Sequence, residues 1–113
     1  MITELRTYTI KRGMMPAWLE LFAEAAEQNR ALGIQVEFAG IDPLNMGTFI
    51  WARTFANESE RVEKLTALYG SDWWQRVGDH FMGHVVNYEV RLLETAFVRQ
   101  TDSSLVNVFD LNG

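Results

Sequence analysis

Two arginines stand beside aromatic residues at a spacing that puts each pair on one face of a β-strand. Arg6 and Tyr8 are two residues apart, and so are Trp51 and Arg53. Side chains at i and i+2 of a strand point to the same side of the sheet. If both pairs face one cleft, two guanidinium groups lie among aromatic rings, which suits a carboxylate or another anionic ligand. These four residues are candidates for ligand binding.

A structural role for these arginines is the alternative. Carboxylates are available on the predicted strands at Glu4, Glu37 and Glu89. Burying an unpaired charge is costly, so an arginine in an interior or an interface is usually paired. Under this interpretation the arginines form ion pairs across the sheet or across a subunit contact, and they bind no ligand.

Acid–base chemistry needs a group whose pKa suits proton transfer. Tyr8 and Glu37 are candidate catalytic residues, provided that burial raises a carboxylate pKa toward neutrality. His80 is a third candidate because a histidine titrates near neutral pH. On the last predicted strand, Tyr88 and Arg91 are further candidates for ligand contacts.

His80 and His84 stand four residues apart, with Asp79 beside the first. On a continuous helix this spacing places two imidazoles on one face, as metal ligands require. Gly83 lies between them and is expected to end the helix, and a third or fourth ligand is not evident. We therefore predict no metal site and no cofactor, although a haem, which needs only one axial histidine, stays compatible with the sequence. His84 is kept as a ligand-binding candidate at the lip of a cleft.

Tryptophans mark the expected core. Trp18 and Trp74 fall on helical apolar stripes, together with Phe22 and Phe81 respectively, so we assign them to the interior. Trp73 directly precedes Trp74, and two adjacent residues do not face the same side of one helix. We therefore expect Trp73 to cover the mouth of a cleft or a subunit contact.

Composition excludes several classes of protein. The chain has 113 residues, no cysteine, a formal charge of −5 and only ten lysines and arginines. Nucleic acid is an unexpected partner because its phosphates are bound mainly by basic groups. The lack of cysteine leaves no disulfide and no thiolate chemistry, which fits a cytoplasmic location. Glutamates interrupt the longest apolar region, so we expect no membrane span.

Periodicity predicts one domain of strands and helices. Alternating residues predict strands over 2–10, 34–40, 48–55 and 85–93. Three- and four-residue spacing predicts helices from Pro16 to Gly33, from the cap at Asn57 to Gly70, and from Ser71 or Asp72 to Gly83. Residues 42–47 are expected to form a longish loop between two strands. The order β-α-β-β-α-(α)-β is that of the ferredoxin-like plan, an α+β fold with a four-stranded antiparallel sheet.

Helices in this plan cover one face of the sheet and leave the other bare. We expect the bare face to carry aromatic residues and to pack against a second copy as a homodimer, because such a face is too apolar for water. The tail after Thr95 lies outside the main pattern. Residues 96–113 are expected to form a C-terminal extension, either a mobile tail or an edge strand over 105–111, beside a domain of residues 1–95.

Three segments resemble a NIPSNAP domain. They are Glu4-Leu5-Arg6-Thr7-Tyr8-Thr9 with Gly13, then Ala67-Leu68-Tyr69 ahead of Trp74, and Glu89-x-Arg91-Leu92-Leu93. The resemblance spans residues 2–94. It implies membership of the dimeric α+β barrel superfamily and a dimeric α/β barrel, in which two sheets enclose an interior cleft. It implies little about chemistry, because related folds carry out many reactions.

Two functional hypotheses follow. The first is binding of a small, partly apolar, anionic molecule in a cleft between sheet and helices, with or without cofactor-independent proton transfer by Tyr8, Glu37 or a histidine. The second is a non-enzymatic interaction or scaffold module whose aromatic sheet face serves only dimerisation. The volume of the interior cavity distinguishes the two hypotheses. A ligand-binding protein keeps a connected cavity of a few hundred cubic ångströms, whereas the side chains of an interface pack without such a cavity.

Overall fold

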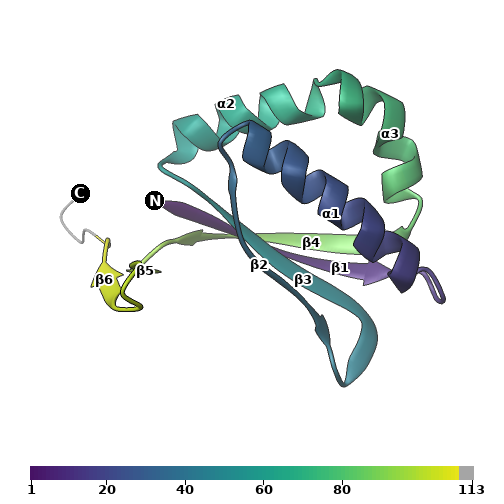
Figure 1. Cartoon of the computed structure of the whole chain (residues 1–113), viewed down its shortest axis with the longest axis horizontal. Coiled ribbons are helices and arrows are strands. Elements are labelled where there is room, and N and C mark those ends of the chain that lie inside the picture. Colours follow the sequence, from purple (N-terminus) through teal and green to yellow (C-terminus); the bar gives the residue numbers. More distant parts are fainter. Residues whose placement is uncertain (110–113) are drawn as a thin grey trace.

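The computed structural model describes residues 1–109 as a sheet covered on one side by three helices (Figure 1). The chain runs β-α-β-β-α-α-β and ends in two short strands. The strands of the main sheet are β1 (Ile2–Ile10), β2 (Gln35–Asp42), β3 (Asn45–Phe55) and β4 (Val85–Glu94). The helices are α1 (Met15–Ala31), α2 (Glu58–Tyr69) and α3 (Asp72–Met82), and the last strands are β5 (Phe97–Arg99) and β6 (Leu105–Asn107).

Local sequence signals fix the helix ends. A proline lies in the first turn of α1, where its missing N–H costs no hydrogen bond. Gly33 follows the helix with a φ of 75°, in the left-handed region that favours glycine. Asn57 caps α2 by accepting from the Glu60 N–H at 2.8 Å, and Ser71 caps α3 by accepting from Trp74 N–H at 3.2 Å. The predicted helices are confirmed.

The four long strands form one antiparallel sheet in the order β2-β3-β1-β4. This is the ferredoxin-like arrangement, so the predicted fold class is confirmed. In the register, Glu4, Arg6 and Tyr8 lie opposite Arg53, Trp51 and Phe49 of β3. Directly opposed side chains share a face of the sheet, so the two predicted arginine pairs point to the same side.

That side is the one covered by helices. Tyr8, Phe49, Trp51 and Phe55 are buried there against Trp18 of α1 and the other aromatic residues of the core. The bare face carries Leu5, Thr7, Ile50 and Thr54 in their place. The expectation of an aromatic bare face was therefore wrong, because the helices cover the face that holds the rings. The full core cluster is Tyr8, Ile10, Trp18, Phe22, Ala25, Ile34, Phe49, Trp51, Phe55, Leu68, Trp73 and Phe81.

Two connections differ from the prediction. The link between β2 and β3 is a tight turn rather than a long loop, since Asp42 Oδ1 accepts a hydrogen bond from Leu44 N–H at 2.8 Å. At the C-terminus, β6 pairs with β5 in a hairpin and does not join the edge of the main sheet. Residues 110 and 111 of the predicted edge strand lie outside the described residues.

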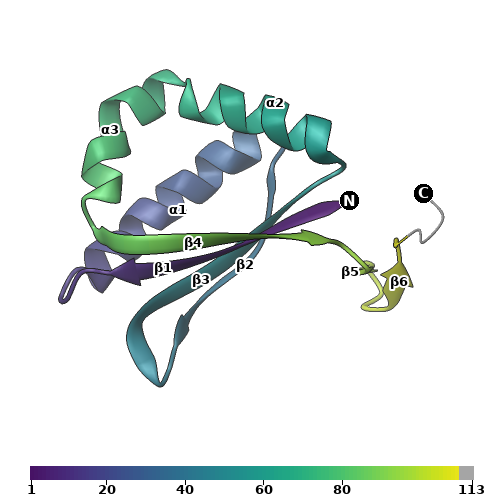
Figure 2. The same ribbon diagram turned by 180° about the vertical axis from the view of Figure 1, so that it is seen from behind.

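The hairpin stands apart from the body of the molecule in both ribbon views (Figures 1 and 2). The radius of gyration is 15.2 Å, whereas a compact chain of this length is expected near about 13 Å. Within residues 1–109, no helix is both long and apolar enough to cross a membrane.

Candidate functional site

Glu4 is the centre of a buried ion cluster beneath the helices. Its Oε1 accepts from Arg6 Nη1 and from Arg53 Nε, both at 2.9 Å, and its Oε2 accepts from Arg61 Nη1 at 2.8 Å. The side chains of Glu4 and Arg53 are each 1% exposed. Glu58, near the start of α2, accepts two further bonds from Arg61. Strand β1 thus supplies a carboxylate around which β1, β3 and α2 place three guanidinium groups.

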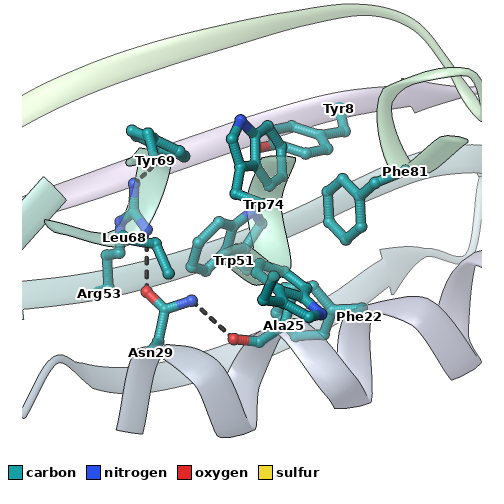
Figure 3. Close-up of a pocket in the computed structure, with 11 residues that line it drawn as sticks. Tyr8, Phe22, Ala25, Asn29, Trp51, Arg53, Leu68, Tyr69, Trp74 and Phe81 are labelled. Atoms are coloured by element: carbon teal, nitrogen blue, oxygen red, sulfur yellow. Dashed lines mark hydrogen bonds between the residues drawn. The ribbon is translucent and has the colours of Figure 1, made fainter. Parts of the chain in front are cut away.

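Arg53 is hydrogen-bonded to three other elements, β1, α1 and α2. Its Nη1 donates to Asn29 Oδ1 of α1 at 2.9 Å, and its Nη2 donates to the Tyr69 hydroxyl of α2 at 2.8 Å (Figure 3). Asn29 in turn donates to the Ala25 carbonyl of its own helix. The guanidinium also lies over the Trp51 ring at 4.9 Å. These contacts leave Arg53 a single orientation.

Arg6 lies among three rings. Its Nε donates to the Tyr8 hydroxyl at 3.0 Å, and its guanidinium carbon is 5.6 to 5.7 Å from the ring centroids of Tyr8, Trp51 and Tyr88. Its side chain is 11% exposed. Tyr88, Val90 and Leu92 lie on this same face of β4 but remain 51%, 43% and 47% exposed. Arg6 therefore stands between the buried interior and an uncovered apolar strip on β4.

A small cavity lies beside this cluster. Figure 3 shows Tyr69, Arg53 and Asn29 at one end of it, with Tyr8 and Phe81 toward the other. About 30 Å³ is open to the centres of water molecules, enough for one or two waters. The aromatic side chains fill the rest of the layer. The lining residues are Tyr8, Phe22, Ala25, Asn29, Trp51, Arg53, Leu68, Tyr69, Trp73, Trp74 and Phe81.

Protonation states follow from these contacts. Burial alone would raise the pKa of Glu4, but the charges of Arg53 and Arg6 and the hydrogen bonds from Arg61 and Arg53 lower it below its ordinary value. Burial raises the pKa of Tyr8 above its ordinary value despite the nearby charge of Arg6. At neutral pH Glu4 is therefore a carboxylate, and Tyr8 is a phenol that can donate a hydrogen bond.

Several donor hydrogens around the cavity have no acceptor among residues 1–109. The buried Trp51 Nε1 has no hydrogen-bond partner. The hydroxyls of Tyr8 and Tyr69 each accept from an arginine, so their own hydrogens must point elsewhere, and no protein acceptor is found for either. All of these residues line the same cavity. The lining thus offers hydrogen-bond donors in excess of acceptors.

The charged groups of the cluster also carry a net positive charge. Three arginines share the two carboxylates of Glu4 and Glu58, which leaves one positive charge in excess. Arg6 and Arg53 are the cations on the buried side of this cluster, and Glu58 is exposed. A buried excess charge is costly unless a partner of opposite sign compensates it.

The structure brings together Arg6, Tyr8, Trp51, Arg53 and Tyr88 of the predicted site. The arrangement decides the structural interpretation of the arginines and leaves their ligand-binding role a prediction. Arg6 and Arg53 do pair structurally, as the alternative required, but with Glu4 and not with Glu37 or Glu89. The pairing uses up only part of their donors.

Other predicted residues lie elsewhere. Glu37 is exposed and accepts from Thr54 Oγ1 on the bare face, because it alternates with Val36, which packs against the core under the helices. Arg91 lies opposite Leu5 and so also points to the bare face. Neither residue reaches Tyr8.

The two histidines do not line the cavity. His84 is buried with its Nδ1 2.9 Å from the His80 carbonyl oxygen, whereas His80 is exposed near the end of α3. Among residues 1–109, no group of three His, Asp or Glu side chains is arranged to hold a metal ion. His80 therefore has no contact with the cluster that would make it the acid or base there.

The expectation that only one of the two adjacent tryptophans faces inward was wrong. Trp73 is buried and donates from Nε1 to Glu24 Oε1 of α1 at 2.6 Å. Trp74 is half-buried, and both rings line the cavity with their centroids 5.8 Å apart. The reason is Gly78, one turn further along α3, since a Cβ there would stand only 3.0 Å from the Trp74 ring. The glycine makes room for a second indole to lean inward.

Asn29 and Tyr69 are site residues that the sequence did not reveal as such. Asn29 fell on an otherwise apolar stripe of α1, and a polar residue in that position indicates a buried hydrogen-bond partner. The ring of Tyr69 packs against the core, and its hydroxyl accepts a hydrogen bond from Arg53. Asn29 was a usable signal, whereas Tyr69 stood in one of the segments that carry the family resemblance without any indication of what its hydroxyl binds.

Comparison with known proteins gives the family. The NIPSNAP family model matches residues 3–99. No protein among those with curated functions matches the sequence. An uncharacterized NIPSNAP domain protein from Burkholderia xenovorans has a similar structure, with a TM-score of 0.76 and 18% identity over 85% of this chain and 95% of that protein.

Two further structures extend the comparison. A NIPSNAP family protein from Agrobacterium tumefaciens has a TM-score of 0.74 and 25% identity, over 81% of this chain and 82% of that one. An antibiotic biosynthesis monooxygenase has a TM-score of 0.65 and 16% identity, over 84% and 98% of the two chains. The last likeness concerns the fold alone. With the family model covering nearly the whole ferredoxin-like domain, this chain belongs to the NIPSNAP family.

Proposed function

We propose that the protein binds a small, partly apolar molecule through an anionic oxygen placed beside Arg6, Tyr8 and Trp51. The observation that carries the proposal is the surplus of buried donors and positive charge around one cavity. Charge-assisted hydrogen bonds to a carboxylate or an enolate oxygen would use the free hydrogens of Tyr8 and Trp51 and compensate the excess cation. A neutral apolar ligand would leave these donor hydrogens without an acceptor and the excess positive charge without a counter-charge.

The size of the cavity limits what enters it. A space that holds one or two waters accepts the oxygen atoms of a head group and no more. The remainder of the ligand would then lie outward, past Arg6, on the exposed strip of Tyr88, Val90 and Leu92. This arrangement explains why the ligand must be both anionic and partly apolar.

Tyr8 would be the acid in any proton transfer at this site. Its pKa is raised, so it holds its proton at neutral pH and can deliver it to a bound enolate. Glu4 is a poor base because three arginines stabilise its charged form. Glu37 and His80 lie away from Tyr8, so a base would have to come from the ligand or from solvent.

The test uses benzoate, which combines an apolar ring with a carboxylate, and its neutral analogue benzamide. We expect benzoate to change the tryptophan fluorescence and to bind at least tenfold more tightly than benzamide. Trp51→Phe should weaken benzoate binding about tenfold or more, the value of a lost hydrogen bond to a charged group. Trp18→Phe is the matched control, because Trp18 Nε1 is also buried without a partner but does not line the cavity.

The proposal fails if benzoate and benzamide bind equally, or if Trp51→Phe and Trp18→Phe have the same effect. A Tyr8→Phe variant separates binding from proton transfer. It should weaken benzoate binding by removing one donor. In a proton-exchange assay on a bound ketone, Tyr8→Phe should also lower the exchange rate, because the variant lacks the phenol hydrogen that would protonate the enolate.

Self-association through the bare sheet face is a second candidate function, favoured by a specific observation. We propose that two copies pack these faces together, since Phe38 and Leu93 are exposed there and Leu5 and Ile50 are half-buried with no helix above them. Glu89 and Arg91 are two residues apart on this face. A two-fold axis between them would pair each with its opposite in the second copy. Sedimentation equilibrium tests this, and a monomer at all accessible concentrations would contradict it.

A further inference from the structure

Two arginine–tyrosine pairs adjoin the interior cavity. The Tyr8 hydroxyl accepts a hydrogen bond from Arg6 Nε at 3.0 Å. The Tyr69 hydroxyl accepts one from Arg53 Nη2 at 2.8 Å. The two arginines are joined to each other through Glu4 Oε1, to which both donate. Both tyrosines line the cavity, with Tyr69 at one end of it and Tyr8 toward the other (Figure 3).

The hydroxyl hydrogen of Tyr69 has no role in binding an anionic oxygen beside Tyr8. Because the Tyr69 oxygen accepts from Arg53, its own hydrogen points away from the guanidinium, and no acceptor for it is found among residues 1–109. A donor in the interior that lacks a partner costs free energy. A ligand with a single oxygen beside Tyr8 would leave this donor unsatisfied.

The two ends of the cavity differ in charge. Arg53 donates three of its five N–H hydrogens, to Glu4 and to two neutral oxygens. Arg6 donates only two of its five, so more unused cationic donors lie at its end. A second anion beside Tyr69 would be buried without a counter-charge, which is costly. A neutral oxygen there accepts the Tyr69 hydrogen without that cost.

The cavity has room for two oxygen atoms. About 30 Å³ is open to the centres of water molecules, which is the space of one or two waters. The Trp51 ring adjoins both pairs, since its centroid is 5.7 Å from the guanidinium carbon of Arg6 and 4.9 Å from that of Arg53. In so small a space, two ligand oxygens must be carried a few bonds apart on one molecule.

We propose that the ligand is an oxo acid, whose carboxylate lies beside Arg6 and Tyr8 and whose keto oxygen accepts a hydrogen bond from Tyr69. The inference rests on the proposed binding of an anionic oxygen at this site. It adds a second, neutral oxygen to the ligand and assigns Tyr69 as the residue that selects for it. Tyr69 thereby distinguishes an oxo acid from a plain carboxylic acid of the same size.

Two pairs of ligands test the second oxygen in the unaltered protein. Benzoylformate and phenylacetate share a carbon skeleton and a carboxylate and differ in one keto oxygen. Benzoylacetate and 3-phenylpropionate form the same kind of pair, with the keto group one carbon further from the carboxylate. Titrations of tryptophan fluorescence measure the four affinities. We expect the oxo acid of at least one pair to bind about fivefold more tightly than its partner, the value of one hydrogen bond.

Tyr69→Phe tests the assignment of the selecting residue. It should remove the preference for the oxo acid, while the plain acid still binds. The matched control is Tyr88→Phe, because Tyr88 does not line the cavity, and this variant should keep the preference. Each preference is a ratio of two affinities within one folded variant. A loss of stability, caused by the missing acceptor for Arg53, therefore does not imitate the result.

The outcomes separate this inference from the proposed function. Equal affinities within both pairs, in a protein that binds the acids, overturn the second oxygen but not the anion site. A preference that persists in Tyr69→Phe overturns the assignment of Tyr69. Failure of all four acids to bind overturns the anion site itself. If Tyr69→Phe does not fold, the comparison of the two pairs in the unaltered protein decides.

Discussion

The two faces of the sheet differ in what their side chains contact, although residues of the two faces alternate along the same strands. On β1, Glu4, Arg6 and Tyr8 point under the helices, where each has a named partner at hydrogen-bond distance. Leu5 and Thr7, which alternate with them, point to the bare face and lie opposite residues of β3 and β4. The covered face is therefore packed and hydrogen-bonded within one chain. If a second chain covers the bare face, as proposed, the energetics of that face should depend on protein concentration.

The largest effects are expected from core aromatic residues on the covered face. Phe49→Ala removes a ring that is 1% exposed and should lower the free energy of unfolding by about 3–5 kcal/mol. Its neighbour Ile50 is on the bare face, and Ile50→Ala should cost about 1 kcal/mol in dilute protein. Urea unfolding at several protein concentrations measures both. We expect the cost of Ile50→Ala to grow with concentration and that of Phe49→Ala to stay constant.

The ion cluster comes next. Glu4→Gln leaves Arg6 and Arg53 buried without their carboxylate and should lower the free energy of unfolding by about 3 kcal/mol. The control Glu58→Gln removes an exposed partner of the same cluster and should have no resolvable effect. Urea unfolding at neutral pH distinguishes them. Equal effects of the two variants would show that burial of Glu4 is unimportant.

Acid should destabilise the protein through the same carboxylate. The pKa of Glu4 is lower in the folded protein than its ordinary value of 4.5. Its contribution is therefore complete above about pH 4.5 and is lost as the pH falls through the lowered value. We expect the unfolding free energy of Glu4→Gln to decline less steeply with acid than that of the parent. Parallel curves would contradict the assignment.

The smallest effect is expected at Thr54 on the bare face. Thr54→Val removes the bond to Glu37 Oε1, which is exposed in the single chain, so the change in unfolding free energy should be within about 0.5 kcal/mol. In the proposed dimer the new methyl group would lie in a drier contact and should strengthen association. Analytical ultracentrifugation checks this, and weaker association would argue that Thr54 stays hydrated.

Sequence patterns were sufficient for the fold because each signal was local. Alternation marked the four strands, while Asn57, Ser71 and Gly33 marked helix ends. The same sequence patterns did not show which face of the sheet the helices cover. Both faces of β1 mix polar and apolar residues, so period-two alternation separates the faces without ranking them. The covered face became evident only from its partners on α1 and α2.

The candidate site was predicted in part for a similar reason. Arg6, Tyr8, Trp51 and Arg53 share a face through strand geometry alone, so spacing identified them. Glu37 was misplaced because the face on which it lies depends on the register of β2 against β3, which composition does not give. The volume of the cavity could not be predicted from the sequence either, because it depends on how eleven side chains of five elements pack around it.

The paired indoles of Trp73 and Trp74 have an optical consequence. Their centroids are 5.8 Å apart and their planes are inclined at 47°, close enough for their electronic transitions to couple and to give circular dichroism bands of opposite sign. Trp73 is tied to α1 through Glu24, and Trp74 packs on Tyr69 of α2. The coupled signal therefore reports the contact of α3 with both other helices. It offers a label-free record of whether the helical layer loosens when an anion enters beneath it.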